Sequence, residues 1–278
     1  MSECVIMVLQ GGLGNQLFQY CAGLAISSQL GGELWLTPVQ EDKHSGRDYR
    51  QTLYKRGKAI GIDGNPSSKA QISRIQSDSF KQQMEAFSAW SPSDYRGHES
   101  IALKGYYQYL PAIESQISLV RDDILQSLSQ IRTQLRLKYQ IYNPRQTSFL
   151  HVRRGDYLKA NPNVFWVHDE TYFLYALQAM KQRTSGPRRW IVLSDDVEWC
   201  KSQPWLKVPP FEIVDEPDQI YGMMLMSLCE GGAIISNSTY SWWGAMLGSG
   251  ALGATVVYPE KWIGEDTPNI FPRNWIGV

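Results

Sequence analysis

The sequence lacks a surplus of charge of either sign. Its 278 residues contain 27 Lys plus Arg and 27 Asp plus Glu, so the formal net charge at pH 7 is zero. Nucleic-acid-binding proteins usually present a basic surface, so we predict no nucleic-acid partner. A local basic site for one or two phosphates stays compatible with this balance.

Cysteine is scarce, and patterns that bind metal are missing. The four cysteines form no Cys-x-x-Cys pair and no Cys/His cluster of the kind that holds zinc. The chain also has no Asp-x-Asp triplet that could hold a divalent ion against a diphosphate. We therefore expect reduced thiols and neither a metal nor any other cofactor.

Long hydrophobic runs are absent as well. No apolar run approaches the ~18 residues of a membrane span. Residues 1–9 have neither the basic region nor the cleavage site of a secretory signal. We expect a cytoplasmic protein, either free or peripheral to a membrane. A length of 278 residues with 43% hydrophobic residues favours two domains.

Short apolar runs that alternate with helical patterns dominate what is present. Residues 4–9 predict a buried strand, followed by a glycine loop, a helix that ends at Gly31 and a strand at 34–36. Further strands are predicted at 148–152, 190–193, 211–214, 233–235 and 255–258, with helices over 172–180, 220–228 and 241–247. This alternation predicts an α/β protein with parallel, doubly wound sheets.

The middle of the chain carries one strong helical pattern. Apolar residues at steps of three and four predict a single long helix over 111–135. Residues 142–145 break it, and we predict the domain boundary after residue 145. Residues 40–100 are polar and weakly patterned, so they predict no definite elements.

Ligands bind at the carboxyl ends of the strands in such sheets, and polar clusters follow three of the predicted strands. The sharpest holds Arg153 and Arg154, whose guanidinium groups suit the oxygens of a diphosphate. Asp156 could fix an arginine in place or accept a proton from an acceptor hydroxyl. A plain Arg–Asp ion pair is the alternative.

The other two clusters follow later strands. Asp195 and Asp196 could accept hydrogen bonds from guanine or ribose, or could cap the next helix. The segment 236–241 precedes a helix whose N-terminus could receive a phosphate. A capping sequence in front of a core helix is the alternative, and we expect Trp242 and Trp243 to pack in the core.

The glycine loop is less specific. Gly12 and Gly14 match the first two glycines of a dinucleotide fingerprint, but Leu17 stands at the third position. Binding of NAD is therefore disfavoured. Backbone N–H groups at this helix N-terminus could still receive a phosphate or a sugar hydroxyl, and a tight turn without a ligand is equally compatible.

In combination, these blocks resemble the α-1,2-fucosyltransferase family. The chain has a His-x-Arg-Arg-x-Asp-Tyr block at 151–157, a Ser-Asp-Asp block at 194–196 and a Ser-Asn-Ser-Thr-Tyr-Ser-Trp-Trp block at 236–243, in the order of the family. Segments 11–20 and 105–108 resemble two further family motifs. The resemblance extends from residue 11 to about 245 and is weak over 40–100.

The resemblance implies a GT-B fold with two Rossmann-like domains and a central cleft. Residues 1–145 would form an acceptor-side domain with the glycine loop, and residues 146–278 would bind the GDP-sugar donor. The implied reaction is an inverting, metal-independent transfer of L-fucose from GDP-β-L-fucose to an oligosaccharide or glycoconjugate acceptor, with O-2 of a terminal β-galactoside as the expected hydroxyl.

The resemblance also implies roles for single residues. Arg153 would stabilise the leaving diphosphate, and Asn15 with Gly14 would approach the fucose–phosphate linkage. Asp156 is the first candidate for the general base, with His168 and Asp169 as remote ones. The other donor-binding residues would be Gly12, His151, Arg154, Tyr157, Asp195, Asp196, Asn237, Ser238 and Thr239.

Three alternatives stay open at this point. The enzyme could use another GDP-linked sugar or form another linkage, which a donor screen would separate. The chain could be a nucleotide-sugar-binding module without turnover, which intact Arg153 and Arg154 argue against. The Arg-Gly-Asp tripeptide at 154–156 could serve adhesion, although it follows a predicted buried strand.

Overall fold

A computed structural model describes residues 4–39, 47–60, 91, 93, 100–183, 189–207, 210–264 and 267–278. The chain divides into two compact units, the first of residues 1–127 and 268–270 and the second of residues 128–267 and 271–278. This division falls after residue 127, whereas the sequence placed a domain boundary after residue 145. Most of the weakly patterned stretch 40–100 lies outside the described residues.

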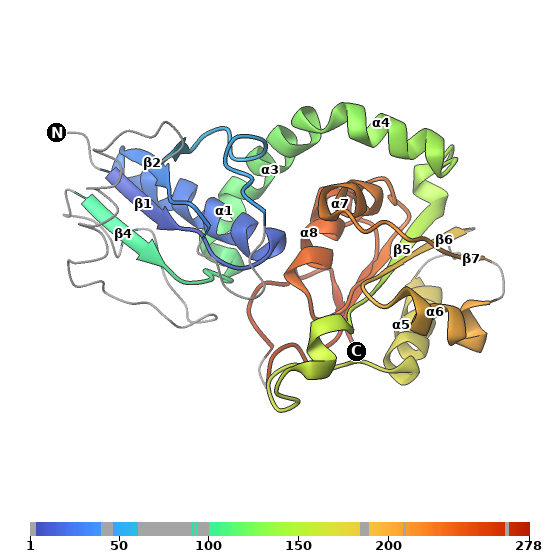
Figure 1. The fold of residues 1–278 in the computed structure, drawn as a ribbon. Coiled ribbons are helices and arrows are strands. Elements are labelled where there is room, and N and C mark those ends of the chain that lie inside the picture. Colours follow the sequence, from blue (N-terminus) through green and yellow to red (C-terminus); the bar gives the residue numbers. More distant parts are fainter. Residues whose placement is uncertain are drawn as a thin grey trace. The chain divides into compact units, whose positions relative to one another are not determined.

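The first unit contains a four-stranded parallel sheet (Figure 1). Its strands are β1 (Cys4–Val8), β2 (Glu33–Leu36), β3 (Lys58–Ala59) and β4 (Ser100–Lys104), in the order β3-β2-β1-β4. Helix α1 (Leu13–Leu30) connects β1 to β2 and packs against α3 (Leu110–Ser127). The left-handed Gly31 (φ 68°) ends α1 as predicted, because glycine adopts this conformation without a Cβ penalty.

The second unit contains a six-stranded parallel sheet in the order β10-β9-β8-β5-β6-β7. Its strands are β5 (Thr147–Val152), β6 (Arg189–Ser194), β7 (Phe211–Ile213), β8 (Ala233–Ile234), β9 (Val256–Tyr258) and β10 (Ile276–Gly277). Five of these six strands were predicted, within one or two residues at each end. The two-residue strand β10 was not, because it is too short to show a pattern.

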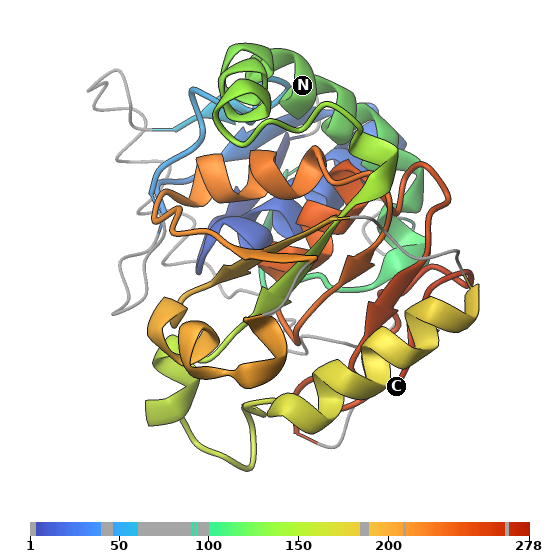
Figure 2. The ribbon, with the colours of Figure 1, turned by 90° about the vertical axis from the view of Figure 1, so that its right-hand side faces the viewer.

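Helices cover both faces of this second sheet. They are α4 (Ser129–Lys138), α5 (Glu170–Arg183), α6 (Val197–Ser202), α7 (Gln219–Ser227) and α8 (Thr239–Leu247), with 3₁₀ turns η2 (Pro144–Gln146), η3 (Gly155–Lys159) and η4 (Pro204–Leu206). Helices α5 and α6 lie on one face and α7 and α8 on the other (Figure 2). No helix in the described part of the chain is long and apolar enough to cross a membrane.

Strand β5 lies inside this sheet and is buried along its whole length. Leu150 and Val152 pack with α5, whereas His151 on the opposite face lies beside Tyr240 of α8, with ring centroids 5.7 Å apart. Burial on both faces is typical of an inner strand of a parallel sheet, and here it includes the polar residues Thr147, Ser148 and His151. Trp242 and Trp243 of α8 are fully buried, which confirms their predicted place in the core.

The prediction of one long helix over 111–135 was wrong. Two helices occupy this region, and Leu128 between them leaves helical geometry with φ −107° and ψ 18°. The Ser127 hydroxyl donates to the carbonyl oxygen of Asp123 over 2.5 Å. A serine that bonds back to the preceding turn in this way bends a helix, and periodicity alone does not reveal it.

The strand order of each sheet reverses at one point. In the second unit, β6 and β7 extend from one side of β5, and β8, β9 and β10 extend from the other. In the first unit, β2 and β3 lie on one side of β1 and β4 on the other. Ligands in open α/β sheets bind beyond the carboxyl ends of the strands at such switch points. The pairs β5/β8 and β1/β4 therefore mark where a site is expected.

Candidate active site

The loops after β5 and β8 are joined directly at the switch point of the second unit. The hydroxyl of Ser236, which follows β8, donates to the carbonyl oxygen of His151 over 2.6 Å. The same hydroxyl accepts a hydrogen bond from the backbone N–H of Arg153 over 3.0 Å. These bonds fix the backbone from which the Arg153 side chain leaves the sheet.

Arg153 lies between two carboxylates. Its Nη1 is 2.7 Å from Oδ2 of Asp195, and its Nη2 is 2.5 Å from Oδ1 of Asp156. The guanidinium carbon lies 4.9 Å from the ring centroid of Tyr157. The Nε atom of Arg153 is buried and has no hydrogen-bond partner among the described residues. The buried Nε–H of Arg153 is thus available to a further acceptor.

Arg154 is held by the next carboxylate along the chain. Its Nε donates to Oδ2 of Asp196 over 3.1 Å, and its guanidinium stacks 4.3 Å from the ring centroid of Trp199. The other oxygen of Asp196 accepts the backbone N–H of Trp199 over 3.1 Å and caps α6. Asp196 is therefore both the helix cap that the sequence offered as an alternative and the ion-pair partner of Arg154.

Asp195 connects the two arginines. Its Oδ1 accepts the backbone N–H of Arg154 over 2.8 Å, while its Oδ2 contacts the Arg153 side chain. We call Arg153, Arg154, Asp156, Asp195 and Asp196 the arginine–aspartate cluster. The ion pair between Arg153 and Asp156 is the alternative raised from the sequence. The roles of Asp156 as general base and of Asp195 toward guanine or ribose stay predictions.

Asn237 joins three segments around the start of α8. Its Nδ2 donates to the carbonyl oxygens of Trp166 and Trp262, both over 3.0 Å. The Tyr157 hydroxyl donates to the Asn237 carbonyl oxygen over 3.1 Å, and burial raises the pKa of Tyr157 to about 12. Ser238 is the N-cap of α8 but makes no side-chain capping bond. The Tyr157 hydroxyl thus links the residue before the N-cap of α8 to the turn that carries Asp156.

Three buried polar atoms near this switch point have no hydrogen-bond partner among the described residues. They are Nε of Arg153, Nδ1 of His151 and Oδ1 of Asn237. Each buried polar atom left in this state costs about 1–3 kcal/mol. Such groups in a folded protein call for an explanation, and a polar ligand supplies one. All three are predicted site residues, but only the folded structure reveals that one atom of each stays unsatisfied.

Burial sets the protonation state of His151. Removal from water, with a smaller effect of the nearby Arg153 charge, lowers the pKa of His151 to about 3. The imidazole is therefore neutral at pH 7. The unfolded chain, in which a histidine has a pKa of about 6.5, binds an extra proton between about pH 3 and 6.5. The stability contributed by this histidine is complete above that range and is lost as the pH falls through it.

We expect His151→Gln to weaken the acid sensitivity of the protein. The free energy of unfolding should fall between pH 7 and pH 5 by about 2 kcal/mol less than in the wild type. Urea unfolding followed by tryptophan fluorescence measures this difference. His168, whose pKa burial lowers to about 4, keeps part of the dependence in the variant. An identical pH dependence in both proteins would contradict the assignment.

The glycine loop of the first unit lies at its own switch point. Gly12 is the N-cap of α1, and a Cβ added at this position would meet no other atom within 4 Å. Gly11 has φ 73°, and a Cβ there would lie 2.8 Å from Nδ2 of Asn15. Gly14 and Asn15 follow in the first turn of α1, and Oδ1 of Asn15 accepts a hydrogen bond from Nε2 of Gln108 over 3.2 Å. Gln108 was not among the predicted site residues.

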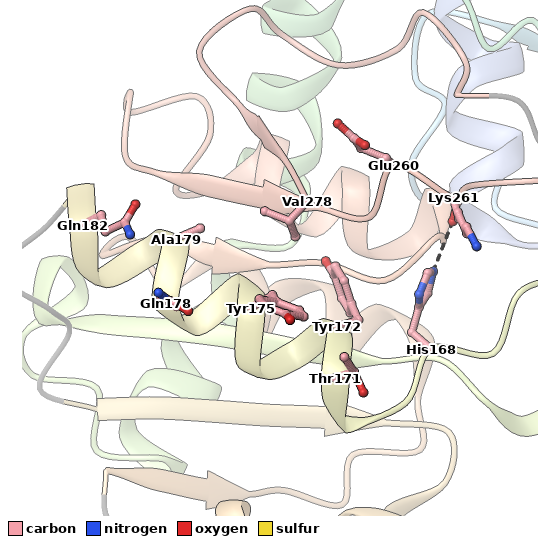
Figure 3. Close-up of a pocket in the computed structure, with 10 residues that line it drawn as sticks. All are labelled: His168, Thr171, Tyr172, Tyr175, Gln178, Ala179, Gln182, Glu260, Lys261 and Val278. Atoms are coloured by element: carbon pink, nitrogen blue, oxygen red, sulfur yellow. Dashed lines mark hydrogen bonds between the residues drawn. The ribbon is translucent and has the colours of Figure 1, made fainter.

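The second unit also has an open depression of about 620 Å³ between α5 and the residues Glu260, Lys261 and Val278 (Figure 3). His168 at one end of it contacts the carbonyl oxygen of Lys261 through Nε2 over 3.1 Å. None of its lining residues belongs to the arginine–aspartate cluster. Asp169, a remote candidate for the general base, caps the start of α5 by accepting the N–H of Thr171 over 2.9 Å.

Comparison with known proteins identifies the family. The family model described as glycosyl transferase family 11 matches residues 3–278. This chain belongs to that family. Among the described residues of this family 11 member, no three His, Cys, Asp or Glu side chains gather as a candidate metal site.

Curated relatives span the whole chain. It is 28% identical to the O-antigen biosynthesis glycosyltransferase WbnK of Escherichia coli, over 97% of this chain and 99% of the relative. It is 25% identical to an alpha-1,2-colitosyltransferase of Escherichia coli, over 99% and 98%. It is also 25% identical to galactoside alpha-(1,2)-fucosyltransferase 2 of Hylobates lar, over 96% and 77%.

Solved structures support the fold. NodZ alpha-1,6-fucosyltransferase soaked with GDP-fucose aligns with a TM-score of 0.50 at 15% identity, over 89% of this chain and 93% of that one. POFUT1 in complex with GDP aligns with a TM-score of 0.51 at 13% identity, over 89% and 95%. The family 11 chain thus has an α/β fold with parallel sheets that is similar to these fucosyltransferases.

Proposed function

We propose that this family 11 glycosyltransferase moves L-fucose from GDP-β-L-fucose to O-2 of a terminal β-galactoside. The observation that carries the proposal is the arginine–aspartate cluster at the β5/β8 switch point, where a buried Nε donor of Arg153 has no partner among the described residues. A diphosphate oxygen would satisfy this donor, because guanidinium groups bind phosphate through several N–H groups at once.

The reaction would be a single displacement at C1 of fucose. The acceptor oxygen forms the new bond to C1 as the bond from C1 to the β-phosphate oxygen breaks, and GDP leaves. Arg153 would stabilise the negative charge that develops on the leaving diphosphate, where preorganised donors act most strongly. The proton of the acceptor hydroxyl passes to a base, and Asp156 is the proposed one, because it contacts Arg153, the residue that we propose to bind the diphosphate.

Transfer of fucose should not depend on a divalent ion. We expect release of GDP and formation of an α-1,2-fucoside when the protein is mixed with GDP-fucose and lactose, at equal rates with and without EDTA. Chromatography of GDP and linkage analysis of the product measure both. Loss of all activity with EDTA, restored by Mg²⁺ or Mn²⁺, would contradict the metal-independent mechanism.

The donor sugar has a second candidate. One relative that covers nearly the whole chain is named an alpha-1,2-colitosyltransferase, so GDP-linked colitose belongs in the same assay. A ratio of kcat/KM values that favours GDP-fucose would support the proposal. A ratio that favours GDP-colitose would support the same class of reaction with GDP-colitose, and not GDP-fucose, as the donor.

A further inference from the structure

Hydrogen bonds of Gln19 connect the loops after β1 and β4 in the first unit. The buried Gln19 side chain donates through Nε2 to the carbonyl oxygens of Gly105 over 3.0 Å and Gln10 over 3.3 Å. Its Oε1 accepts the backbone N–H of Gln10 over 3.0 Å. One fully buried amide thus holds the two loops together at the switch point of the sheet.

Gln108 lies in the loop after β4, and only one of its two side-chain amide atoms has a hydrogen-bond partner among the described residues. Its side chain is buried, with 4% of the residue exposed, and Nε2 donates to Oδ1 of Asn15 in the first turn of α1. Its Oε1 is buried and has no hydrogen-bond partner among the described residues. A buried carbonyl oxygen in this state costs about 1–3 kcal/mol, so it marks a position where a ligand could supply the missing donor.

The backbone before Gln108 is strained. Tyr107 has φ 53°, which lies in the left-handed region that non-glycine residues seldom enter. Strain of this kind persists only where the surrounding structure imposes it, and it gathers at functional sites. The next residue, Gln108, is the one that contacts Asn15 in the first turn of α1.

The switch point of the first unit has no charged side chains in its two loops, in contrast to the arginine–aspartate cluster at the switch point of the second unit. Residues 9–17 after β1 and residues 105–109 after β4 include no Asp, Glu, Lys or Arg. Amide groups, tyrosines and backbone N–H groups make up the polar chemistry of the two loops. Such a set suits the hydroxyl groups of a neutral sugar and offers no counter-charge to a diphosphate.

We infer that Gln108 is a sugar-binding residue of this enzyme. Its Oε1 accepts a hydrogen bond from a hydroxyl of a neutral pyranose, while its Nε2 holds Asn15 in place. The inference rests on the proposed function, because the pyranose is either the acceptor sugar or the sugar carried by the nucleotide. The chemistry is the same for both sources, and the experiment separates them.

The test uses the full chain with Gln108→Met, which keeps the length of the side chain and removes both amide atoms. Gln108→Glu, which keeps an oxygen acceptor, serves as a second variant. Gln126→Met on the exposed side of α3 is the matched control. Saturation-transfer NMR with lactose and calorimetric titration with GDP and GDP-fucose give the readouts, and the thermal midpoint reports folding.

We expect Gln108→Met to weaken one sugar-dependent readout at least tenfold, with GDP affinity unchanged. A weaker lactose signal assigns the site to the acceptor. A GDP-fucose affinity that falls to that of GDP assigns it to the sugar of the donor. Gln108→Glu should retain part of the affected readout. If both sugar readouts stay within twofold of the control, the inference is overturned.

The binding readouts do not require turnover. If the wild type transfers no fucose but loses sugar binding on Gln108→Met, the proposed function fails and the role of Gln108 stands. A wild type that gives no lactose signal and binds GDP-fucose no more tightly than GDP overturns the role of Gln108. Transfer by the wild type decides the proposed function separately.

Discussion

Arg153→Ala is expected to lower kcat by about 10²–10³, which corresponds to about 3–4 kcal/mol of lost transition-state stabilisation. The physical reason is that the substitution removes the guanidinium that we propose to stabilise the leaving diphosphate. It also leaves Asp156 and Asp195 without the cation that lies 2.5 and 2.7 Å away. Their negative charge would then repel the diphosphate.

Steady-state kinetics with GDP-fucose and lactose measure the effect. Arg189→Ala is the matched control, because the Arg189 side chain has nearly the same exposure, 28% against 29%, and is paired with Glu212. Arg189 is the first residue of β6, whereas Asp195 of the cluster follows the last residue of this strand, so the two lie at opposite ends of it. The control should keep normal kinetics and lose at most about 1 kcal/mol of stability. Near-wild-type turnover by Arg153→Ala would contradict the proposed role of Arg153 in stabilising the leaving diphosphate.

Gly155→Ala is expected to reduce kcat/KM by about 10–100-fold although glycine carries no functional group. A Cβ at this position would lie 2.5 Å from Oδ2 and 2.9 Å from Cγ of Asp195. The carboxylate must then move away and give up its bonds to the Arg153 side chain and the Arg154 backbone. The guanidinium would lose one of the two groups that orient it.

A double-mutant cycle with Asp195→Ala tests this explanation. Removal of the carboxylate removes the clash, so Gly155→Ala should add little to the effect of Asp195→Ala. The coupling is measured from kcat/KM for the single and double variants. Effects that simply add would show that Gly155 acts through something other than Asp195.

Most regular elements of the second unit could be predicted from local patterns. Continuous apolar runs predict buried strands, and Trp190 to Leu193 of β6 is one of them. The glycine after α1 and the aspartates before α5 and α6 act as caps within a few residues of sequence. These features depend on neighbours along the chain, which the sequence shows directly.

Other elements could not be found in this way. Strand β4 has a short, mixed pattern, and β10 has two residues, so both depend on pairing with strands that are distant in sequence. The break between α3 and α4 lies beside Ser127, whose hydroxyl donates to the carbonyl oxygen of Asp123. In each case a tertiary or side-chain contact overrides the periodicity.

The sequence by itself determined which polar residues follow which strands. It therefore predicted that one group of side chains lies at the carboxyl ends of the strands of one sheet, namely His151, Arg153, Arg154, Asp195 and Asn237. Only the tertiary structure decided which of them touch. Asp195 reaches Arg153 because β6 pairs with β5, and Gln108 reaches Asn15 across 93 residues because β4 pairs with β1. Strand order determines these partners, and strand order is a property of the folded sheet.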